Sequence, residues 1–600
     1  MPQYTAPTRD TLFLIEDVLK VADHAGKPGF ENLDPDMIAP ILEEAGRFNA
    51  EVIAPLNLPG DRQGCTRHED GTVTTPDGFK QAYNKTCEAG WNTLVMPEKF
   101  GGQGLPHVLG YAVEEYMSSA NTAFGMYFGL TSGAVSALIA RGSPEQQEAY
   151  IPKMVSGQWG GTMNLTEPQC GTDLGLIRTK AEPKGNGSYS ITGTKIFISS
   201  GEHDLTDNII HLVLAKTPDA PEGTKGISLF VVPKFLLDDD GEAGERNAVS
   251  CGAIEEKMGI HGNATCVMNY DGATGWMVGE ENKGLAAMFI MMNAARIAVG
   301  LQGLAQAEVA YQNGVAYALD RRQGRALTGP VDPEEKADPL IVHPDIRRLL
   351  MDARAQIEGL RALTMFMGLQ IDVAAHDADE SIKGTADDLV QLLTPVLKGY
   401  GTDLGFRITK EMQQVWGGHG YIEENGMGQF LRDARIAQIY EGANGIQAMD
   451  LVGRKLAMNG GRAIQAMFGL VDTEIENASD IEALTDLRTA MERANGELKA
   501  ATMWLMQNAM ANPNNAGSAA YMYMEILGLV SLGLMWLRMG IAAAGRLAAG
   551  EGDAAFYEAK LTTARHYALG QLPEAGALRR KLEAGADTIM SMPAEAFARA

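Results

Sequence analysis

One carboxylate in this chain stands on a glycine-containing loop where it could act as a base. Glu441 follows Tyr440 and precedes Gly442, between two segments with helical spacing. The glycine lets the backbone approach a bound molecule closely. Ile439 and Tyr440 supply apolar surroundings, which raise the pKa of a carboxylate and make it a stronger base. A Glu before a Gly is more often a solvated helix end, so this loop alone leaves both interpretations open.

Three further segments contain residue types that suit a ligand site. They lie at residues 163–173, 195–201 and 414–421 and read MNLTEPQCGTD, KIFISSG and QVWGGHGY. Together with the Glu441 loop, they occur in the order and at roughly the spacing typical of acyl-CoA dehydrogenases. Four motifs in this order are hard to obtain by chance. The chain therefore resembles that family from Leu42 to Arg454, which implies an enzyme that desaturates an acyl thioester between its α and β carbons.

The resemblance implies that FAD takes up a hydride from the substrate, because no protein side chain can do so. Three of the matching positions depart from the family pattern, with Thr172 for the usual Ser, Phe197 for Trp and Ser199 for Thr. Each replacement keeps a hydroxyl or an aromatic ring, so we expect the contacts to remain. The residues expected to bind FAD in this part of the chain are Met163, Leu165, Thr166, Gly171, Thr172, Phe197 and Ser199.

FAD bridges two subunits in this family, so a second group of residues is expected to contact it. Arg321 resembles the family arginine that reaches the pyrophosphate, although by itself it is equally well explained as an exposed charge at a helix end. The glycines after Gln414 permit close approach to the backbone. Ala443 stands where Thr is common and loses one hydroxyl contact. The residues expected in this group are Arg321, Gln414, Gly417, Gly418, Ala443, Asn444 and Gly445.

The resemblance also assigns the base and the substrate contacts. Some branches of the family place the base immediately before an arginine, where this chain has Ala295 and Arg296, so Glu441 is expected to remove the α proton. Its backbone N–H and an FAD hydroxyl would polarise the thioester carbonyl. Arg296 supports the site by its charge or is a structural ion-pair partner, and Asn293 replaces an acidic residue that several relatives use near CoA. The residues expected to contact the acyl-CoA are Thr172, Asn293, Arg296, Trp416, Tyr440 and Gly442.

The length of the chain and its opening, Tyr4 to Asp10, resemble the family branch that acts on 3-methylmercaptopropionyl-CoA in dimethylsulfoniopropionate breakdown. A thioether tail needs a short, apolar and polarizable pocket. Trp416 with Met288, Met291 and Met292 could line one, although methionines in a helix more often belong to a core. A short- or medium-chain fatty acyl-CoA dehydrogenase is the second hypothesis. An acyl-CoA oxidase and a non-catalytic relative that binds nucleic acid rank below it.

Hydrophobic periodicity changes twice along the chain, from helical to β-rich near residue 160 and back to helical near residue 288. With the resemblance, this order predicts an α+β protein with the acyl-CoA dehydrogenase fold. The apolar stretch from Ile526 to Leu537 is too short for a membrane span, so we expect a buried helix. The expected parts are an N-terminal helical domain (1–159), a middle β-barrel domain (160–280), a C-terminal helical bundle (281–455) and a helical extension (456–600).

Charge and cysteine spacing exclude several classes of function. The chain has 76 acidic and 50 basic residues, a net charge of -26, which opposes binding to nucleic acids and anionic membranes. Five scattered cysteines and no histidine–carboxylate pairs at ligand spacing indicate neither a disulfide framework nor a metal site. An acidic N-terminal segment is unlike a signal peptide, so we expect a cytoplasmic protein. By the resemblance, it would be a homodimer that passes electrons to electron-transferring flavoprotein.

Overall fold

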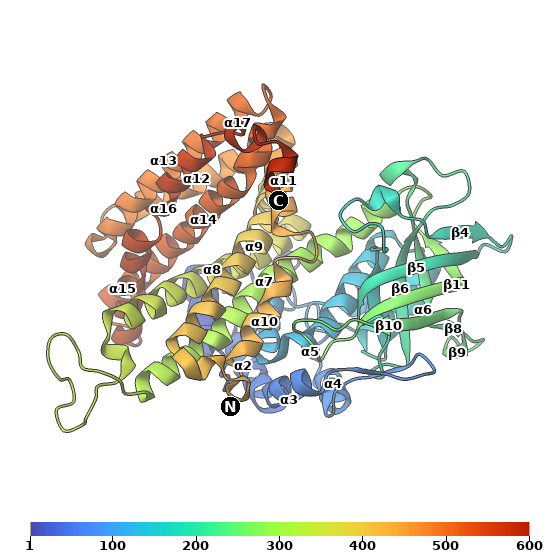
Figure 1. Ribbon diagram of the computed structural model, residues 1–600, viewed down its shortest axis with the longest axis horizontal. Helices are drawn as coiled ribbons and strands as arrows, with labels where there is room; N and C mark the ends of the chain where they lie inside the picture. Colours follow the sequence, from blue (N-terminus) through green and yellow to red (C-terminus); the bar gives the residue numbers. More distant parts are fainter. Residues whose placement is uncertain (1, 599–600) are drawn as a thin grey trace. The chain divides into compact units, whose positions relative to one another are not determined.

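The computed structural model describes residues 2–598 and divides into two compact units, a sheet unit and a helical unit (Figure 1). The sheet unit consists of Glu44–Leu105 and Val113–Ala298. The helical unit consists of Met1–Glu43, Pro106–Ala112 and Val299–Ala600. The expected order of helices, strands and helices is confirmed, and the molecule is an α+β protein.

The sheet unit is built on seven strands. Its spatial order is β3 (Trp159–Asn164), β6 (Asn208–Ala215), β7 (Ser228–Pro233), β11 (Thr265–Val278), β5 (Tyr189–Ser199) and β4 (Lys180–Pro183), with β10 (Val249–Ile254) also paired to β11. β3 and β6 run parallel, whereas the other pairs are antiparallel. Two small ladders accompany the sheet: β1 (Thr66–Arg67) with β2 (Val73–Thr74), and β8 (Phe235–Leu237) with β9 (Ala243–Arg246).

Strand β6 is buried on both of its faces, which explains why it is an almost continuous apolar run. Leu212 and Leu214 of β6 belong to one core, whereas the alternate residues Val213 and Ala215 belong to the other. Helices add side chains to the first core, among them Ile151. The helices that lie in this unit or enter it are α3 (Asn57–Gln63), α4 (Phe79–Glu88), α5 (His107–Arg141), α6 (Pro144–Val155) and the start of α7 (Gly284–Asp320).

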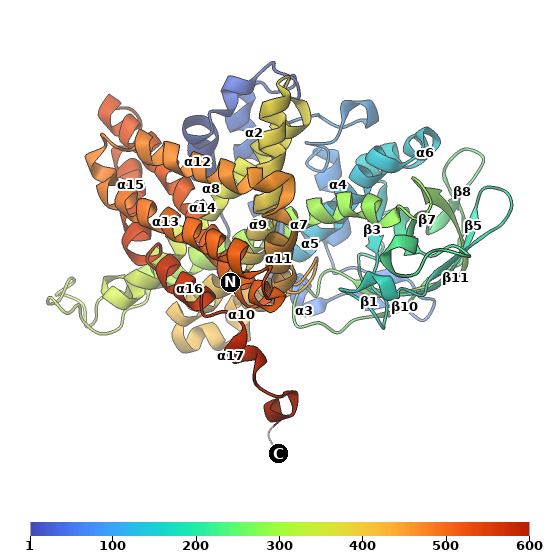
Figure 2. The same ribbon diagram turned by 90° about the horizontal axis from the view of Figure 1, so that it is seen from above.

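The helical unit is organised around three long helices, α8 (Pro344–His376), α9 (Glu380–Val415) and α14 (Pro513–Ala549). Figures 1 and 2 show the C-terminal helices gathered around α14. Every residue from Ile526 to Leu537 is buried, so the expected buried helix is confirmed. The remaining helices of this unit are α1 (Thr8–Phe13), α10 (Met427–Ala437), α11 (Asn444–Asp450), α12 (Arg462–Asn477), α13 (Thr485–Asn508), α15 (Ala554–Gly570), α16 (Glu574–Leu582) and α17 (Asp587–Met590), and α2 (Pro35–Phe48) begins in it.

Three of the described helices, α5, α7 and α14, are long and apolar enough to cross a membrane, judged by length and composition alone. Of their most apolar stretches, 56%, 50% and 83% are buried inside the protein. Glycines allow α7 and α9 to pack closely. A Cβ on Gly405 would lie 2.4 Å from the Gly303 carbonyl oxygen, so only glycine permits this contact.

A buried ion network joins distant parts of the helical unit. Arg361 on α8 donates to Asp10 (2.5 Å) and to Glu308 (2.6 Å). Lys560 on α15 pairs with Glu358 at 2.9 Å and also contacts Asp10. Burial would raise the pKa of Asp10, but Lys560 and Arg361 outweigh that effect and lower it. The network therefore fixes the N-terminal segment to the bundle and to the extension.

We expect Lys560→Met to lower the free energy of unfolding by about 3–5 kcal/mol, because it removes the buried cation that Asp10 and Glu358 share and leaves each carboxylate with an arginine alone. Chemical and thermal denaturation would measure the loss. Lys499→Met is the matched control, since Lys499 pairs with Asp472 at the surface, where the two side chains are 41% and 56% exposed. That pair should contribute less than about 1 kcal/mol. Equal losses in the two variants would contradict the importance of the buried network.

Candidate active site

The residues expected to bind FAD in the sheet unit come from two adjacent segments. The Ile196 N–H donates to the Thr166 carbonyl (2.9 Å), which places the end of β3 beside the end of β5. Met163, Leu165 and Ser199 are partly exposed there. The structure therefore brings together the residues predicted from these two motifs: Met163, Leu165, Thr166, Gly171, Thr172, Phe197 and Ser199.

A buried ion pair holds these two segments together. Lys195 is fully buried, and its Nζ donates to Glu167 Oε1 (2.8 Å) and to the Leu165 carbonyl (3.0 Å). Glu167 also accepts from the Arg178 and Thr179 N–H groups and from the Thr179 hydroxyl. Burial raises the pKa of Glu167, but Lys195 and these hydrogen bonds outweigh it and hold the pKa at about 2. The sequence did not single out either residue of this pair, although both lie inside the quoted motifs.

Phe197 has a backbone conformation that few side chains adopt. Its φ is +58°, and its side chain is 59% exposed, although it is a large apolar residue inside a strand. A non-glycine residue in the left-handed region is uncommon, and such residues cluster at ligand sites. Gly171 and Thr172 are also exposed. This surface combines an apolar ring, exposed backbone and a hydroxyl group, a set that suits a flat heteroaromatic ligand with phosphates.

The Glu441 loop lies between α10 and α11 in the helical unit. Glu441 has φ +55° and Gly442 has φ +86°, so two successive residues are left-handed. The Gln447 amide donates to the Glu441 carbonyl (3.0 Å) and to the Gly442 carbonyl (3.3 Å). The Tyr440 hydroxyl donates to Gln302 on α7, and burial raises the pKa of Tyr440. The carboxylate thus stands on a strained, hydrogen-bonded loop and is itself partly exposed.

The side chain of Asn444 connects this loop to α9. It is 4% exposed, and its amide donates to Asp403 (2.9 Å) and to Thr402 (3.0 Å). Its amide oxygen accepts from the buried Lys398, which also donates to the Gly442 carbonyl (2.7 Å). Ala443 and Gly445 are exposed on either side. Sequence reasoning missed Lys398, for which the only signal is a lysine in an otherwise apolar helical run.

The segment after α9 presents backbone rather than side chains. A Cβ added to Gly417 or Gly418 would meet nothing within 4 Å, and Gln414 is exposed. Trp416 stacks on Tyr317 with ring centroids 4.3 Å apart, and its indole N–H donates to the Asn313 carbonyl (3.0 Å). Tyr317 was not predicted from the sequence.

Arg321 follows the end of α7 and is exposed. Together with the exposed Gln414 and the open backbone at Gly417 and Gly418, it offers a positive charge and polar groups to an anionic ligand. These residues belong to the helical unit, whereas the Phe197 surface belongs to the sheet unit.

The start of α7 carries the remaining expected substrate contacts. Arg296 is 6% exposed and donates to Asn293 at 3.3 Å, and its guanidinium lies 5.8 Å from the Phe289 ring centre. Met288 and Met291 are buried in the apolar core of the sheet unit, at 0% and 1% exposure. Their assignment as walls of a thioether pocket is therefore wrong, because both side chains pack among core residues. In residues 2–598, no group of three His, Cys, Asp or Glu side chains could hold a metal ion.

Four family models match successive parts of the chain. The acyl-CoA dehydrogenase N-terminal domain matches residues 40–158, its middle domain residues 162–273 and its C-terminal domain residues 282–456. A model described as acetyl-CoA dehydrogenase C-terminal like matches residues 467–593. The fold expected from the motifs, with three domains and a helical extension, is thereby confirmed.

Curated relatives and solved structures agree with these models. The chain is 42% identical to 3-methylmercaptopropionyl-CoA dehydrogenase of Ruegeria pomeroyi, over 98% of this chain and 99% of the relative. It is 35% identical to a butyryl-CoA dehydrogenase of Syntrophomonas wolfei, over 94% of each. The crystal structure of an acyl-CoA dehydrogenase complexed with FAD from Bacillus anthracis matches with a TM-score of 0.72 and 21% identity, over 92% of this chain and 89% of that one. This chain belongs to the acyl-CoA dehydrogenase family and is an oxidoreductase that acts on a CH–CH group.

Proposed function

We propose that the protein desaturates 3-methylmercaptopropionyl-CoA to 3-methylthioacryloyl-CoA, a step of dimethylsulfoniopropionate breakdown, with Glu441 as the base. The observation that carries the assignment of the base is the Glu441 loop, which holds a partly exposed carboxylate at φ +55° between hydrogen-bonded ends. The alternative position for a base, 295, is an alanine. The thioether substrate rests on the relative that is 42% identical over 98% of this chain.

The donor set suits FAD as the cofactor. The exposed ring of Phe197, with Met163, Leu165 and Thr166, offers an apolar surface and a hydroxyl to an isoalloxazine ring. Open backbone and the Arg321 charge suit a pyrophosphate. The other residues that would hold the cofactor are Gly171, Thr172, Ser199, Gln414, Gly417, Gly418, Ala443, Asn444 and Gly445. When bound, FAD would supply the acceptor for the hydride that leaves the β carbon.

The chain's own groups would perform the proton chemistry. The Glu441 carboxylate takes the proton from the α carbon of the thioester, and its backbone N–H donates to the thioester oxygen, where negative charge develops. Arg296 adds positive charge, and Thr172, Asn293, Trp416, Tyr440 and Gly442 complete the proposed substrate contacts. A positioned base contributes about 10²–10⁴ in rate and a preorganised donor about 10²–10³.

We further propose that the protein is a cytoplasmic homodimer that passes electrons to electron-transferring flavoprotein. The exposure of Arg321 and of the backbone at Gly417 and Gly418 supports the dimer, because family members use these positions toward a cofactor shared between subunits. Family membership supports the acceptor. A short- or medium-chain fatty acyl-CoA dehydrogenase is the second candidate, and the butyryl-CoA dehydrogenase that is 35% identical supports it.

Glu441→Gln should abolish reduction of the flavin, because the amide cannot take the α proton. The rate of flavin bleaching is measured after anaerobic addition of acyl-CoA to the purified yellow protein. In the variant, this rate should be lower than in the parent by a factor of about 10²–10⁴. Glu424→Gln is the matched control, since Glu424 is an exposed carboxylate in the short helical turn before α10. Bleaching at the parental rate in Glu441→Gln would remove Glu441 as the base.

Substrate preference is tested by the same bleaching reaction with three thioesters. We expect 3-methylmercaptopropionyl-CoA to reduce the parent faster than butyryl-CoA and octanoyl-CoA do. Faster reduction by butyryl-CoA would favour the second candidate. Turnover with oxygen alone, without another acceptor, would favour an oxidase instead.

Lys195→Met should weaken FAD binding by about 10-fold or more, because it leaves the buried Glu167 unpaired and frees the two segments that it joins. Flavin content per protein and dissociation during dilution would measure the effect. Lys184→Met is the control, because Lys184 is an exposed lysine directly after β4 of the same sheet, and its ammonium donates to the Thr274 hydroxyl (2.8 Å). Full flavin content in Lys195→Met would contradict the proposed role of the pair.

A further inference from the structure

We propose that the C-terminal extension positions the catalytic loop through hydrogen bonds. The proposal rests on the assignment of Glu441 as the base. A connected path runs from α14, in the extension, to the loop that carries the base. Its members are Tyr521, Asp403, Asn444 and Lys398.

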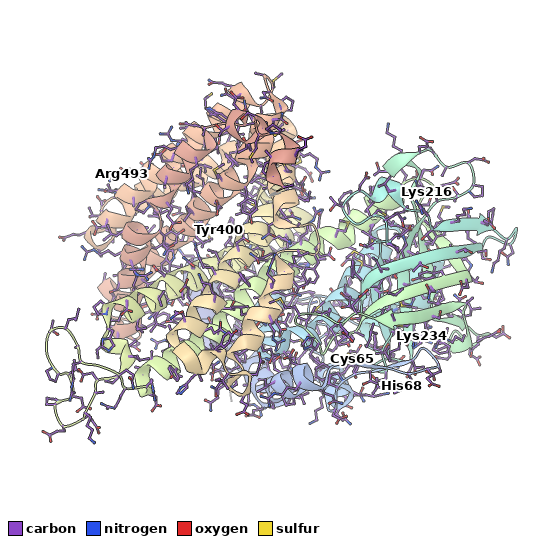
Figure 3. All side chains as sticks on the ribbon, in the orientation of Figure 1. Cys65, His68, Lys216, Lys234, Tyr400 and Arg493 are labelled. Atoms are coloured by element: carbon purple, nitrogen blue, oxygen red, sulfur yellow. The ribbon has the colours of Figure 1, made fainter. Side chains whose placement is uncertain are left out.

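The helix that carries Tyr521 packs directly on α9. A Cβ on Gly399 of α9 would lie 2.4 Å from Met524 Sδ, and a Cβ on Gly528 of α14 would lie 2.3 Å from the Tyr400 ring. Tyr400 is labelled in Figure 3. A Cβ at either position would overlap a side chain of the opposite helix, so each glycine leaves the space into which that side chain packs. This proximity gives α14 a fixed relation to the residues of α9 that serve the loop.

Asp403 on α9 connects the extension to both ends of the loop. Its Oδ2 accepts from the Tyr521 hydroxyl at 2.5 Å. Its Oδ1 accepts from Gln438 Nε2 (2.6 Å), which precedes Glu441, and from Asn444 Nδ2 (2.9 Å), which follows it. The Asp403 carboxylate therefore holds both ends of the segment from Gln438 to Asn444. The Tyr521 hydroxyl, which comes from the extension, orients that carboxylate.

Lys398 completes the path and lies five residues before Asp403 on α9. Its side chain is fully buried, and its Nζ donates to the Gly442 carbonyl (2.7 Å) and to Asn444 Oδ1 (2.9 Å). A buried ammonium must find acceptors, so the loop carbonyl is held where the lysine can reach it. Because Glu441 is left-handed, its conformation persists only while such contacts over-determine it.

This arrangement makes Tyr521 a positioning residue. Its hydroxyl contacts the side chains of Asp403 and Asn444, and it acts on the loop through these two residues. A small displacement of a base lowers the rate of proton transfer more than it lowers substrate binding. The extension should therefore influence the chemical step.

The test compares two variants of the same helix, Tyr521→Phe and Tyr523→Phe. Tyr523 is the matched control, because its buried hydroxyl bonds to Thr502 on α13 (2.8 Å) and not to the path. With the acyl-CoA that bleaches the parent fastest, we expect Tyr521→Phe to lower the bleaching rate at saturating substrate by about 3–10-fold. Its flavin content and substrate Kd should match the parent. Tyr523→Phe should lower the melting temperature and keep the parental bleaching rate.

The primary deuterium isotope effect at the α carbon separates positioning from simple loss of stability. In Tyr521→Phe, the isotope effect should be at least as large as in the parent, because proton transfer becomes slower. A parental rate in Tyr521→Phe, or an equal fall in both variants, would overturn the inference. The Glu441→Gln variant is measured in the same assay, so that failure of the base assignment can be distinguished from failure of the role of the extension. Bleaching that survives in Glu441→Gln removes the base assignment, whereas its loss together with an unaffected Tyr521→Phe removes only the role of the extension.

Discussion

The burial of lysine ammonium groups controls how the functional segments of this protein are held. Lys195, Lys398 and Lys560 are each fully buried. An ammonium away from water must be surrounded by acceptors, and its long flexible stem lets it reach acceptors on several segments at once. Each of these lysines therefore joins segments that are distant from one another in the sequence.

The three lysines act on different parts of the molecule. Lys195 joins the ends of β3 and β5, Lys398 fixes the turn after Glu441, and Lys560 attaches the N-terminal segment to α8 and α15. The partners differ in kind. Lys195 and Lys560 pair with carboxylates, whereas Lys398 donates to a backbone carbonyl and to an amide oxygen. A loop carbonyl is thus fixed by a charge-assisted hydrogen bond, which is stronger than a neutral one.

The sequence predicted the order of elements and the motif residues, because both are local signals. The apolar run of β6 and the glycines around residue 417 can be recognised within a few positions. The contacts that support the site could not be predicted in this way. Asp403 meets Tyr521 across 118 positions, and neither residue has a distinctive neighbourhood. Met288 failed as a pocket residue for a related reason, since helical spacing does not say which apolar face meets a core and which meets a ligand.

The extension is not a separate module placed beside a finished enzyme. Its helix α14 buries Ile526 to Leu537 completely and contacts α8, α9 and α11, so it supplies part of the core on which the Glu441 loop stands. Gly399 leaves space for the Met524 side chain of α14, and Gly528 leaves space for the Tyr400 ring of α9. Because α14 packs on α9, the Tyr521 hydroxyl can reach the Asp403 carboxylate. Close packing between helices therefore comes first, and the hydrogen-bonded path to the loop depends on it.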